Sequence, residues 1–159
     1  MDTVIIPAPT EKISKYFTWK DALWLPTWNR MTKPEEINQS IIDNLIITFH
    51  KADEIREFFN AAMNIHCAYR PPAYNALPSI KGAPNSGHVT GMAIDYDIKG
   101  IVCDDVRKRL SDPMPGAVNK TNMSFIELHG LRMEKRPGSN WVHNDWKGVP
   151  PGGTRYFAV

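Results

Sequence analysis

The chain has 159 residues and a formal net charge of +2, with 42% hydrophobic and 23% charged residues. These values are typical of one soluble globular domain that buries a core, and they argue against a disordered chain. The charges of the two signs are nearly balanced and form no long run, so we do not expect nucleic acid as a partner. Nothing in the composition points to an oligomer, and we expect a monomer.

The N-terminal residues do not resemble an export signal. Asp2 stands where a signal peptide carries positive charge, and the apolar run at 4–6 is short. No apolar stretch has the length of a membrane span, so membrane insertion is not expected. Two cysteines, Cys67 and Cys103, are too few for a disulfide framework and indicate reduced thiols in a cytoplasmic chain.

The first predicted elements are helical. Residues 1–30 hold three prolines and three of the five tryptophans, which predicts an irregular segment with a short helix at 18–25. A long helix is predicted at 34–59, because Thr32 and Pro34 form a start signal and apolar residues recur every four positions after it. These apolar positions are Ile37, Ile41, Leu45 and Phe49.

Short strands and loops are predicted after the long helix. A strand is expected at 65–69, a loop rich in Pro, Asn and Gly at 71–85, and a second strand at 93–98. Alternation in the second strand places Asp95 on the face away from the apolar residues. Cys67 lies in the first, apolar strand and is interpreted as chemically inert.

The remaining elements are two short helices and then an antiparallel hairpin. Their ranges are 102–110 and 122–129 for the helices, and 131–134 and 141–145 for the strands, joined by a loop at 135–140. Residues 147–159 are interpreted as a C-terminal tail. Helices first and antiparallel strands later predict an α+β fold, in which N-terminal helices pack on a small antiparallel sheet. The whole chain, 1–159, is expected to form a single domain.

Two histidines and one aspartate form a possible metal site. His88 and Asp95 stand seven residues apart, and His143 follows later in Trp141-Val142-His143. Two imidazoles and a carboxylate are a ligand set suited to zinc with one position left for water. Residues seven apart face opposite sides of an unbroken strand, but the glycines at 87 and 91 allow a turn that brings both groups together.

The predicted hairpin brings further side chains toward His143. By the period of two, Trp141, His143 and Asp145 share one face. A symmetric closure of the loop places Glu134 opposite Trp141 and Arg132 opposite His143. Glu134 would then lie one diagonal step from His143.

Three motifs carry a resemblance to a known family. They are Ser86, His88, Gly91, Ala93 and Asp95; Trp141-Val142-His143; and Tyr69-Arg70-Pro71-Pro72 with Asn75. In this order and spacing, over roughly residues 17–146, the chain resembles the zinc D-alanyl-D-alanine carboxypeptidases and L-alanyl-D-glutamate endopeptidases. Within that family it is most similar to the short bacteriophage lysis enzymes.

The resemblance implies one Zn²⁺ per chain with an open position for water. The implied ligands are His88, Asp95 and His143. It also implies that Arg70 is a catalytic and substrate-binding residue, since its guanidinium can hold a substrate carboxylate or the oxyanion of the attacked carbonyl. The implied substrate site further contains Tyr69, Ser86 and Trp141.

The general base is the point at which the chain departs from many family members. They carry an acidic residue three positions before the last histidine, where this chain has Asn140, and an amide cannot accept the proton. The phage members carry a glutamate at the end of the preceding strand, which Glu134 matches. Asp145 is the alternative base, and it could equally orient a metal ligand.

The expected function is a zinc-dependent peptidase that hydrolyses peptide bonds in peptidoglycan stem peptides, as a bacteriophage endolysin does. Such an enzyme is made in the host cytoplasm without a signal peptide and acts on the cell wall after release, or is associated with the virion. Two other functions remain open. One is a non-catalytic zinc-containing module for cell-wall binding or virion structure, which Asn140 favours, and the other is a cytoplasmic D-Ala-D-Ala dipeptidase. The sequence leaves the scissile bond undecided.

Overall fold

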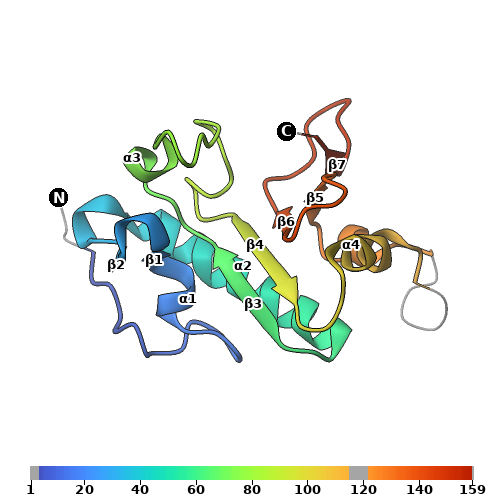
Figure 1. Ribbon diagram of the computed structural model, residues 1–159, viewed down its shortest axis with the longest axis horizontal. Coiled ribbons are helices and arrows are strands. Elements are labelled where there is room, and N and C mark those ends of the chain that lie inside the picture. The colour runs from blue at the N-terminus through green and yellow to red at the C-terminus, as the bar shows by residue number, and fades with distance from the viewer. Residues whose placement is uncertain (1–3, 115–121, 159) are drawn as a thin grey trace.

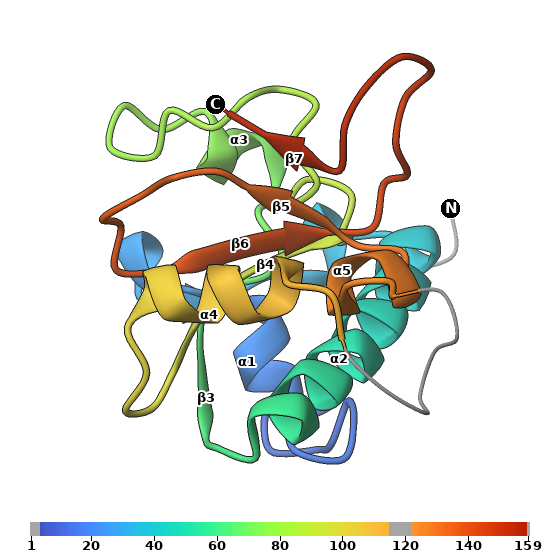
Figure 2. The same cartoon turned by 90° about the vertical axis from the view of Figure 1, so that its right-hand side faces the viewer.

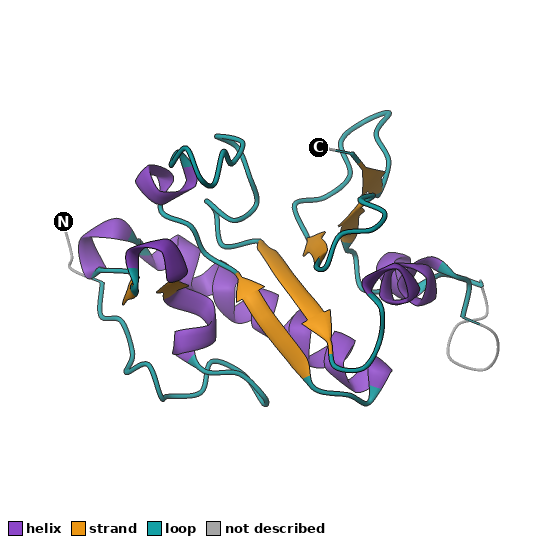
Figure 3. Cartoon of the chain, in the orientation of Figure 1, coloured by secondary structure: helices purple, strands orange, loops and turns teal. Residues whose placement is uncertain are grey.

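The computed structural model of the protein describes residues 4–114 and 122–158. In this part of the chain, five α-helices and two small sheets form one α+β domain, as the order of elements predicts (Figures 1 and 3). The two ends of the predicted domain, 1–3 and 159, lie outside the described residues. No helix in the described ranges combines the length and apolar character needed to cross a membrane.

The main sheet has five strands in the order β3-β4-β6-β5-β7. Their bounds are Met63–Cys67 for β3, Ala93–Ile98 for β4, Arg132–Glu134 for β5, Val142–Asp145 for β6 and Tyr156–Phe157 for β7. The first four pair antiparallel, whereas β7 pairs parallel to β5. The region predicted as a C-terminal tail therefore contributes an edge strand, which lies beyond β5 in Figure 2.

The long helix α2, Gln39–Phe59, supports this sheet from behind in Figure 1. Its buried apolar residues pack against the apolar face of β4, which presents Ile94, Tyr96 and Ile98. The predicted alternation of β4 is confirmed, and Asp95 lies on the opposite, partly exposed face. The core therefore forms between α2 and one face of the sheet, while the other face is left for polar side chains.

The predicted start of the long helix at residue 34 is wrong. Pro34–Glu36 form a separate 3-10 turn, η2, and the backbone is extended at Ile37 and Asn38. The Asn38 side chain accepts a hydrogen bond from the backbone N–H of Ile41 at 3.0 Å and so begins α2. The Thr32 hydroxyl does not cap the helix, because it donates to the carbonyl of Leu23.

Residues 1–30 are more regular than predicted. The short helix α1 is Trp19–Leu23, followed by a two-stranded antiparallel sheet with the 3-10 turn η1, Pro26–Trp28, between its strands. Those strands are β1, Trp24–Leu25, and β2, Arg30–Met31. Strands of two residues carry too little alternation for a sequence pattern to reveal them.

A buried carboxylate attaches the N-terminal segment to α2. Asp53 accepts hydrogen bonds from the Ser14 hydroxyl at 2.9 Å and from the backbone N–H groups of Lys15 and Tyr16 at 2.9 and 3.2 Å. We expect Asp53→Ala to lower the free energy of unfolding by about 1–3 kcal/mol, because three donors lose their acceptor. Urea unfolding measures this effect, and Asp43→Ala, at an exposed site on the same helix, is the control. Equal unfolding midpoints for the two variants would contradict this role.

The smaller helices differ from the predictions mainly at their ends. Helix α3, Pro72–Asn75, lies inside the region predicted as a loop. Helix α4, Cys103–Ser111, is shifted by one residue, and α5, Phe125–Leu128, is shorter than predicted because the Ser124 side chain caps it. Figure 2 shows α4 beside β6, where it also contacts the hairpin loop.

Candidate metal centre

His88 is held at the start of the site by its surroundings. Its backbone N–H donates to the Ser86 hydroxyl at 3.3 Å, and its carbonyl accepts from the backbone N–H of Arg70 at 3.0 Å. The side chain is 1% exposed, and ring Nδ1 lies 2.7 Å from the carbonyl of Ala68. Because a carbonyl only accepts, Nδ1 carries the proton and Nε2 is left as the free ligand atom.

The loop of His88 is also fixed from the side of α2. The Thr48 hydroxyl donates to the carbonyl of Gly91 at 2.7 Å, and the Asn44 side-chain amide donates to the carbonyl of Thr90 at 2.9 Å. Gly91 adopts a φ of +72°, and a Cβ there would lie 3.0 Å from the carbonyl oxygen of Ile41. This residue therefore has to be glycine for the loop to approach the helix so closely.

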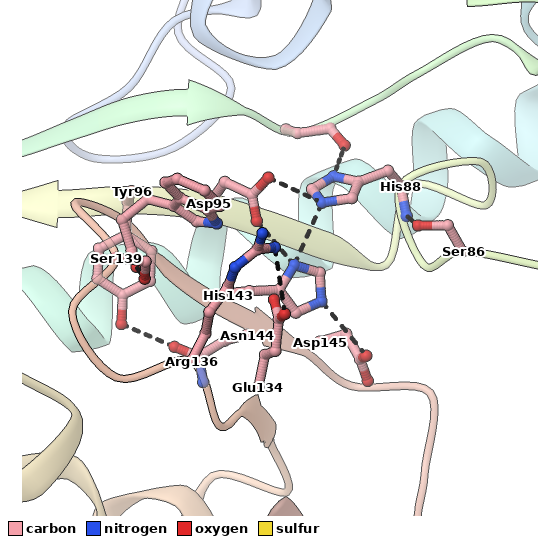
Figure 4. Close-up of polar contacts among 12 residues, drawn as sticks. Ser86, His88, Asp95, Tyr96, Glu134, Arg136, Ser139, His143, Asn144 and Asp145 are labelled. Carbon is pink, nitrogen blue, oxygen red and sulfur yellow. Dashed lines mark hydrogen bonds and ion pairs between the residues drawn. The ribbon is translucent and has the colours of Figure 1, made fainter. Parts of the chain in front are cut away.

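The three predicted ligands converge on one point, as Figure 4 shows. Asp95 and His143 are direct partners on β4 and β6, and Asp95 Oδ1 lies 2.7 Å from His143 Nδ1. His88 Nε2 lies 3.2 Å from Asp95 Oδ2 and 3.2 Å from His143 Nδ1. The turn at the two glycines thus overcomes the odd spacing of His88 and Asp95, as predicted.

The spacing and chemistry of these atoms fit a zinc ion. A tetrahedral zinc with bonds of about 2.0–2.1 Å separates its ligand atoms by about 3.3 Å. The two distances of 3.2 Å match this value, and the third, at 2.7 Å, requires a small outward movement. Imidazole nitrogen and carboxylate oxygen are both donors that zinc accepts in catalytic sites.

The charges of the site favour a cation between these groups. Burial would lower the pKa of His88, but the Asp95 carboxylate outweighs it and raises this pKa to about 10. Burial would raise the pKa of Asp95, yet the two histidines hold that pKa well below its ordinary range. Two imidazoles beside a carboxylate that is held in its charged form suit a metal cation, which the histidines bind in their neutral form.

Cys67 lies near the same point, although this cysteine was interpreted as chemically inert. Cys67, His88 and Asp95 offer ligand atoms within 4.8 Å of one another and could hold a metal ion. The sequence gives no signal for this proximity, because the register of β3 against β4 shifts between Ile65 and Cys67. An irregularity of this kind displaces a side chain relative to the regular alternation.

Strand β3 ends earlier than predicted. The strand ends at Cys67 and not at Tyr69, because the next residues bond outside the ladder. The Ala68 carbonyl accepts from His88, and the backbone N–H of Tyr69 donates to the carbonyl of Ala22. These bonds place Arg70 next to the loop of His88.

The hairpin register differs from the symmetric prediction by two residues. Arg132 pairs with Asp145 and Met133 with Asn144, so one further step places Glu134 beside His143. The loop is therefore two residues longer than predicted, and the Arg107 guanidinium, on α4, holds it by donating to the Ser139 hydroxyl and to the carbonyl of Trp141. The backbone N–H of Gly138 also donates to Asp104 at 3.1 Å.

Asp145 is placed to orient His143. Its carboxylate is 2% exposed and accepts two hydrogen bonds of 2.7 Å from Arg132, while Oδ2 lies 3.7 Å from His143 Nε2. Burial would raise the pKa of Asp145, but His143 and Arg132 hold this pKa well below its ordinary range. A carboxylate so strongly held in its charged form favours the orienting role over that of a proton acceptor.

Loss of this carboxylate is expected to weaken metal binding. We expect Asp145→Asn to lower zinc affinity roughly 10- to 100-fold, because His143 loses the negative charge beside its second ring nitrogen. Competition with a chromophoric chelator measures the affinity. Asp97→Asn, on β4 beside His66, is the matched control and should keep wild-type affinity. Equal affinities for both variants would contradict the orienting role.

Glu134 and Arg70 face the three ligand residues from a cleft of about 430 Å³. Glu134 is 7% exposed, and its nearest charged partner is Arg136, at 3.6 Å. Arg70 Nη2 lies 3.4 Å from Asp95 Oδ2, and its buried Nε has no hydrogen-bond partner among the described residues. Both groups therefore retain bonding capacity toward a molecule in the cleft.

The cleft contains most of the predicted substrate-binding residues and several that were not predicted. Ser86 and Trp141 line it together with Arg70, as expected. The lining also includes three basic residues and an aromatic one that sequence reasoning missed. They are Lys81, Arg136, Lys147 and Phe157. Phe157 comes from β7, and its ring lies edge-on to His143 at a centroid distance of 5.8 Å.

The structure does not bring Tyr69 to the cleft. This side chain is 1% exposed, and its hydroxyl donates to the carbonyl of Glu36 at 2.5 Å on the side toward η2. Burial raises the pKa of Tyr69 to about 12. The geometry does not support the assignment of Tyr69 to substrate binding, because its contacts are those of a core residue beside Arg70.

Comparisons with protein-family models, with curated proteins and with solved structures found no match. The interpretation of the site therefore depends on its own geometry. Two imidazoles and a carboxylate converge, a buried carboxylate and a guanidinium stand beside them, and a cleft gives access.

Proposed function

We propose that the protein is a zinc-dependent peptidase that hydrolyses peptide bonds in peptidoglycan stem peptides. The observation that carries this proposal is the convergence of His88 Nε2, Asp95 and His143 Nδ1 on one side of an accessible cleft. A zinc ion held by these three residues alone would keep one position for water or substrate. The resemblance of the motifs to zinc peptidases of the cell wall supports the same assignment.

A zinc ion held by these three residues would acidify a bound water and polarise the carbonyl of the scissile peptide bond. Glu134 would accept the proton of the attacking water and pass it to the leaving amine, since its ion-pair partner in the described residues, Arg136, stays 3.6 Å away. The Arg70 guanidinium, whose Nε has no partner among the described residues, would donate to the oxyanion that develops on the attacked carbonyl or to a substrate carboxylate.

The charge of the cleft supports an anionic substrate. Lys81, Arg136 and Lys147 line it in addition to Arg70 and Arg132. Stem peptides carry free carboxylates along their length, so these cations would attract and orient them. We further propose that the protein acts on the cell wall after release from the cytoplasm in which it is made.

A second function is favoured by one observation. Cys67 lies close enough to His88 and Asp95 to be considered as a further metal ligand. Four protein ligands are typical of structural zinc sites. A permanently closed centre would correspond to a non-catalytic wall-binding or virion module of the same fold.

Product analysis separates these functions. Purified peptidoglycan is incubated with the zinc-loaded protein, and the soluble fragments are identified by mass spectrometry. We expect new stem-peptide termini that disappear with a chelator and return with added zinc, and the fragment masses identify the cleaved bond. Unchanged fragments, together with protein retained on the insoluble wall, would contradict the peptidase and support the binding module.

A further inference from the structure

Cys67 approaches the candidate metal centre from a different direction than the cleft. It ends β3 directly opposite Asp95 on β4. Its Sγ belongs to the group of ligand atoms that lie within 4.8 Å of one another, yet Cys67 is not among the residues that line the cleft. The thiol therefore lies on the β3 side of Asp95, and the side of the centre that faces the cleft remains accessible to substrate.

The distances place this thiol within reach of a metal ion. Zinc bonds of about 2.3 Å to sulfur and 2.0 Å to nitrogen separate the two donors by about 3.5 Å. Within the group of Cys67, His88 and Asp95, the Cys67 Sγ would have to approach the His88 ligand atom by no more than about 1.3 Å from the limit of 4.8 Å. His143 is not part of this group, so Cys67 and His143 would also have to approach each other.

We propose that Cys67 supplies a fourth protein ligand in the resting protein and leaves the metal when a ligand enters from the cleft. The centre then alternates between a closed form with one sulfur, two nitrogens and one oxygen, and an open form able to bind a substrate. On ligation the thiol releases its proton to solvent, and on release it takes one up. This inference rests on the proposed function, whose metal centre it regulates.

A sulfur ligand would also affect the choice of metal. Thiolate is a soft donor that favours zinc over the hard ions magnesium, calcium and manganese. We expect Cys67→Ser to lower zinc affinity by at least roughly tenfold, the lower end of the loss seen for residues that only support a ligand. Affinity for manganese should change much less.

Cobalt substitution tests the inference without depending on catalysis. The protein loaded with Co²⁺ is expected to show visible d–d bands from the centre and a near-ultraviolet sulfur-to-cobalt charge-transfer band. Cys67→Ser should abolish the charge-transfer band and keep the d–d bands. Cys103→Ser is the matched control, since Cys103 lies on α4 and is the other cysteine of the chain, and it should keep both.

The release of Cys67 is tested with acetohydroxamate, a small oxygen chelator, added to the same cobalt protein. A saturating concentration of acetohydroxamate is expected to remove the charge-transfer band and leave altered d–d bands. A charge-transfer band that persists at saturating acetohydroxamate would overturn the inference. The same holds for d–d bands without any charge-transfer band in the unmodified protein. Neither result would contradict the metal centre itself. The absence of all cobalt bands would overturn the metal centre itself, and the inference with it.

Discussion

Replacement of Glu134 with glutamine is expected to reduce stem-peptide cleavage about 100- to 10,000-fold, the usual contribution of a general base. The amide keeps the shape of the side chain but cannot accept the proton of the attacking water. Zinc content should stay at one ion per chain, because Glu134 is not among the three converging ligands. Release of new amino groups from peptidoglycan measures the cleavage, and elemental analysis measures the metal.

The control for this experiment is Glu35→Gln, at an exposed position outside the cleft. It should cleave at the wild-type rate. Wild-type cleavage by Glu134→Gln would contradict the assignment and transfer the role to Asp145. That outcome would be difficult to reconcile with the two hydrogen bonds that Arg132 donates to Asp145.

Replacement of His88 with alanine is expected to abolish zinc binding and to lower thermal stability. The buried ring connects its loop to the carbonyl of Ala68, and its loss leaves that carbonyl without a partner, at a cost of about 1–3 kcal/mol. Metal that binds only the folded protein adds stability, so the variant also loses this contribution. Melting temperatures with and without zinc measure both effects.

His88→Ala is expected to differ from the wild-type protein in how its melting temperature responds to zinc. The wild-type protein and His50→Ala, an exposed site on α2, should melt at a higher temperature when zinc is added. His88→Ala should not respond. A zinc-dependent increase in His88→Ala equal to that of the wild type would show that the metal binds elsewhere.

Elements with a strong local pattern could be predicted from the sequence. The apolar repeat of α2 and the alternation of β4 each follow from a period that tertiary contacts do not disturb. The three candidate ligand residues, His88, Asp95 and His143, could also be predicted, and Gly87 and Gly91 explain how the first two can meet.

Features that depend on distant contacts could not be predicted. The hairpin loop is held by Arg107 and Asp104 on α4, which bond residues of the loop and so favour a register two residues away from the predicted one. Cys67 reaches the centre only because an irregularity shifts β3 against β4. Strand β7 is too short to show a period, although it completes the site with Phe157.

The position of Tyr69 illustrates the limit of a motif. Arg70 reaches the cleft as its motif implies, whereas the neighbouring Tyr69 points to the opposite side and bonds Glu36. Adjacent residues in an extended chain face opposite sides. A motif therefore indicates which residues belong together, and the backbone decides which of them face the substrate.

The most direct test of the metal centre is anomalous diffraction from crystals of the zinc-loaded protein. We predict one strong zinc peak about 2.0–2.2 Å from His88 Nε2, His143 Nδ1 and an oxygen of Asp95. A zinc peak bound by other residues, or no peak among these three under saturating zinc, would contradict the proposed centre and the peptidase built on it.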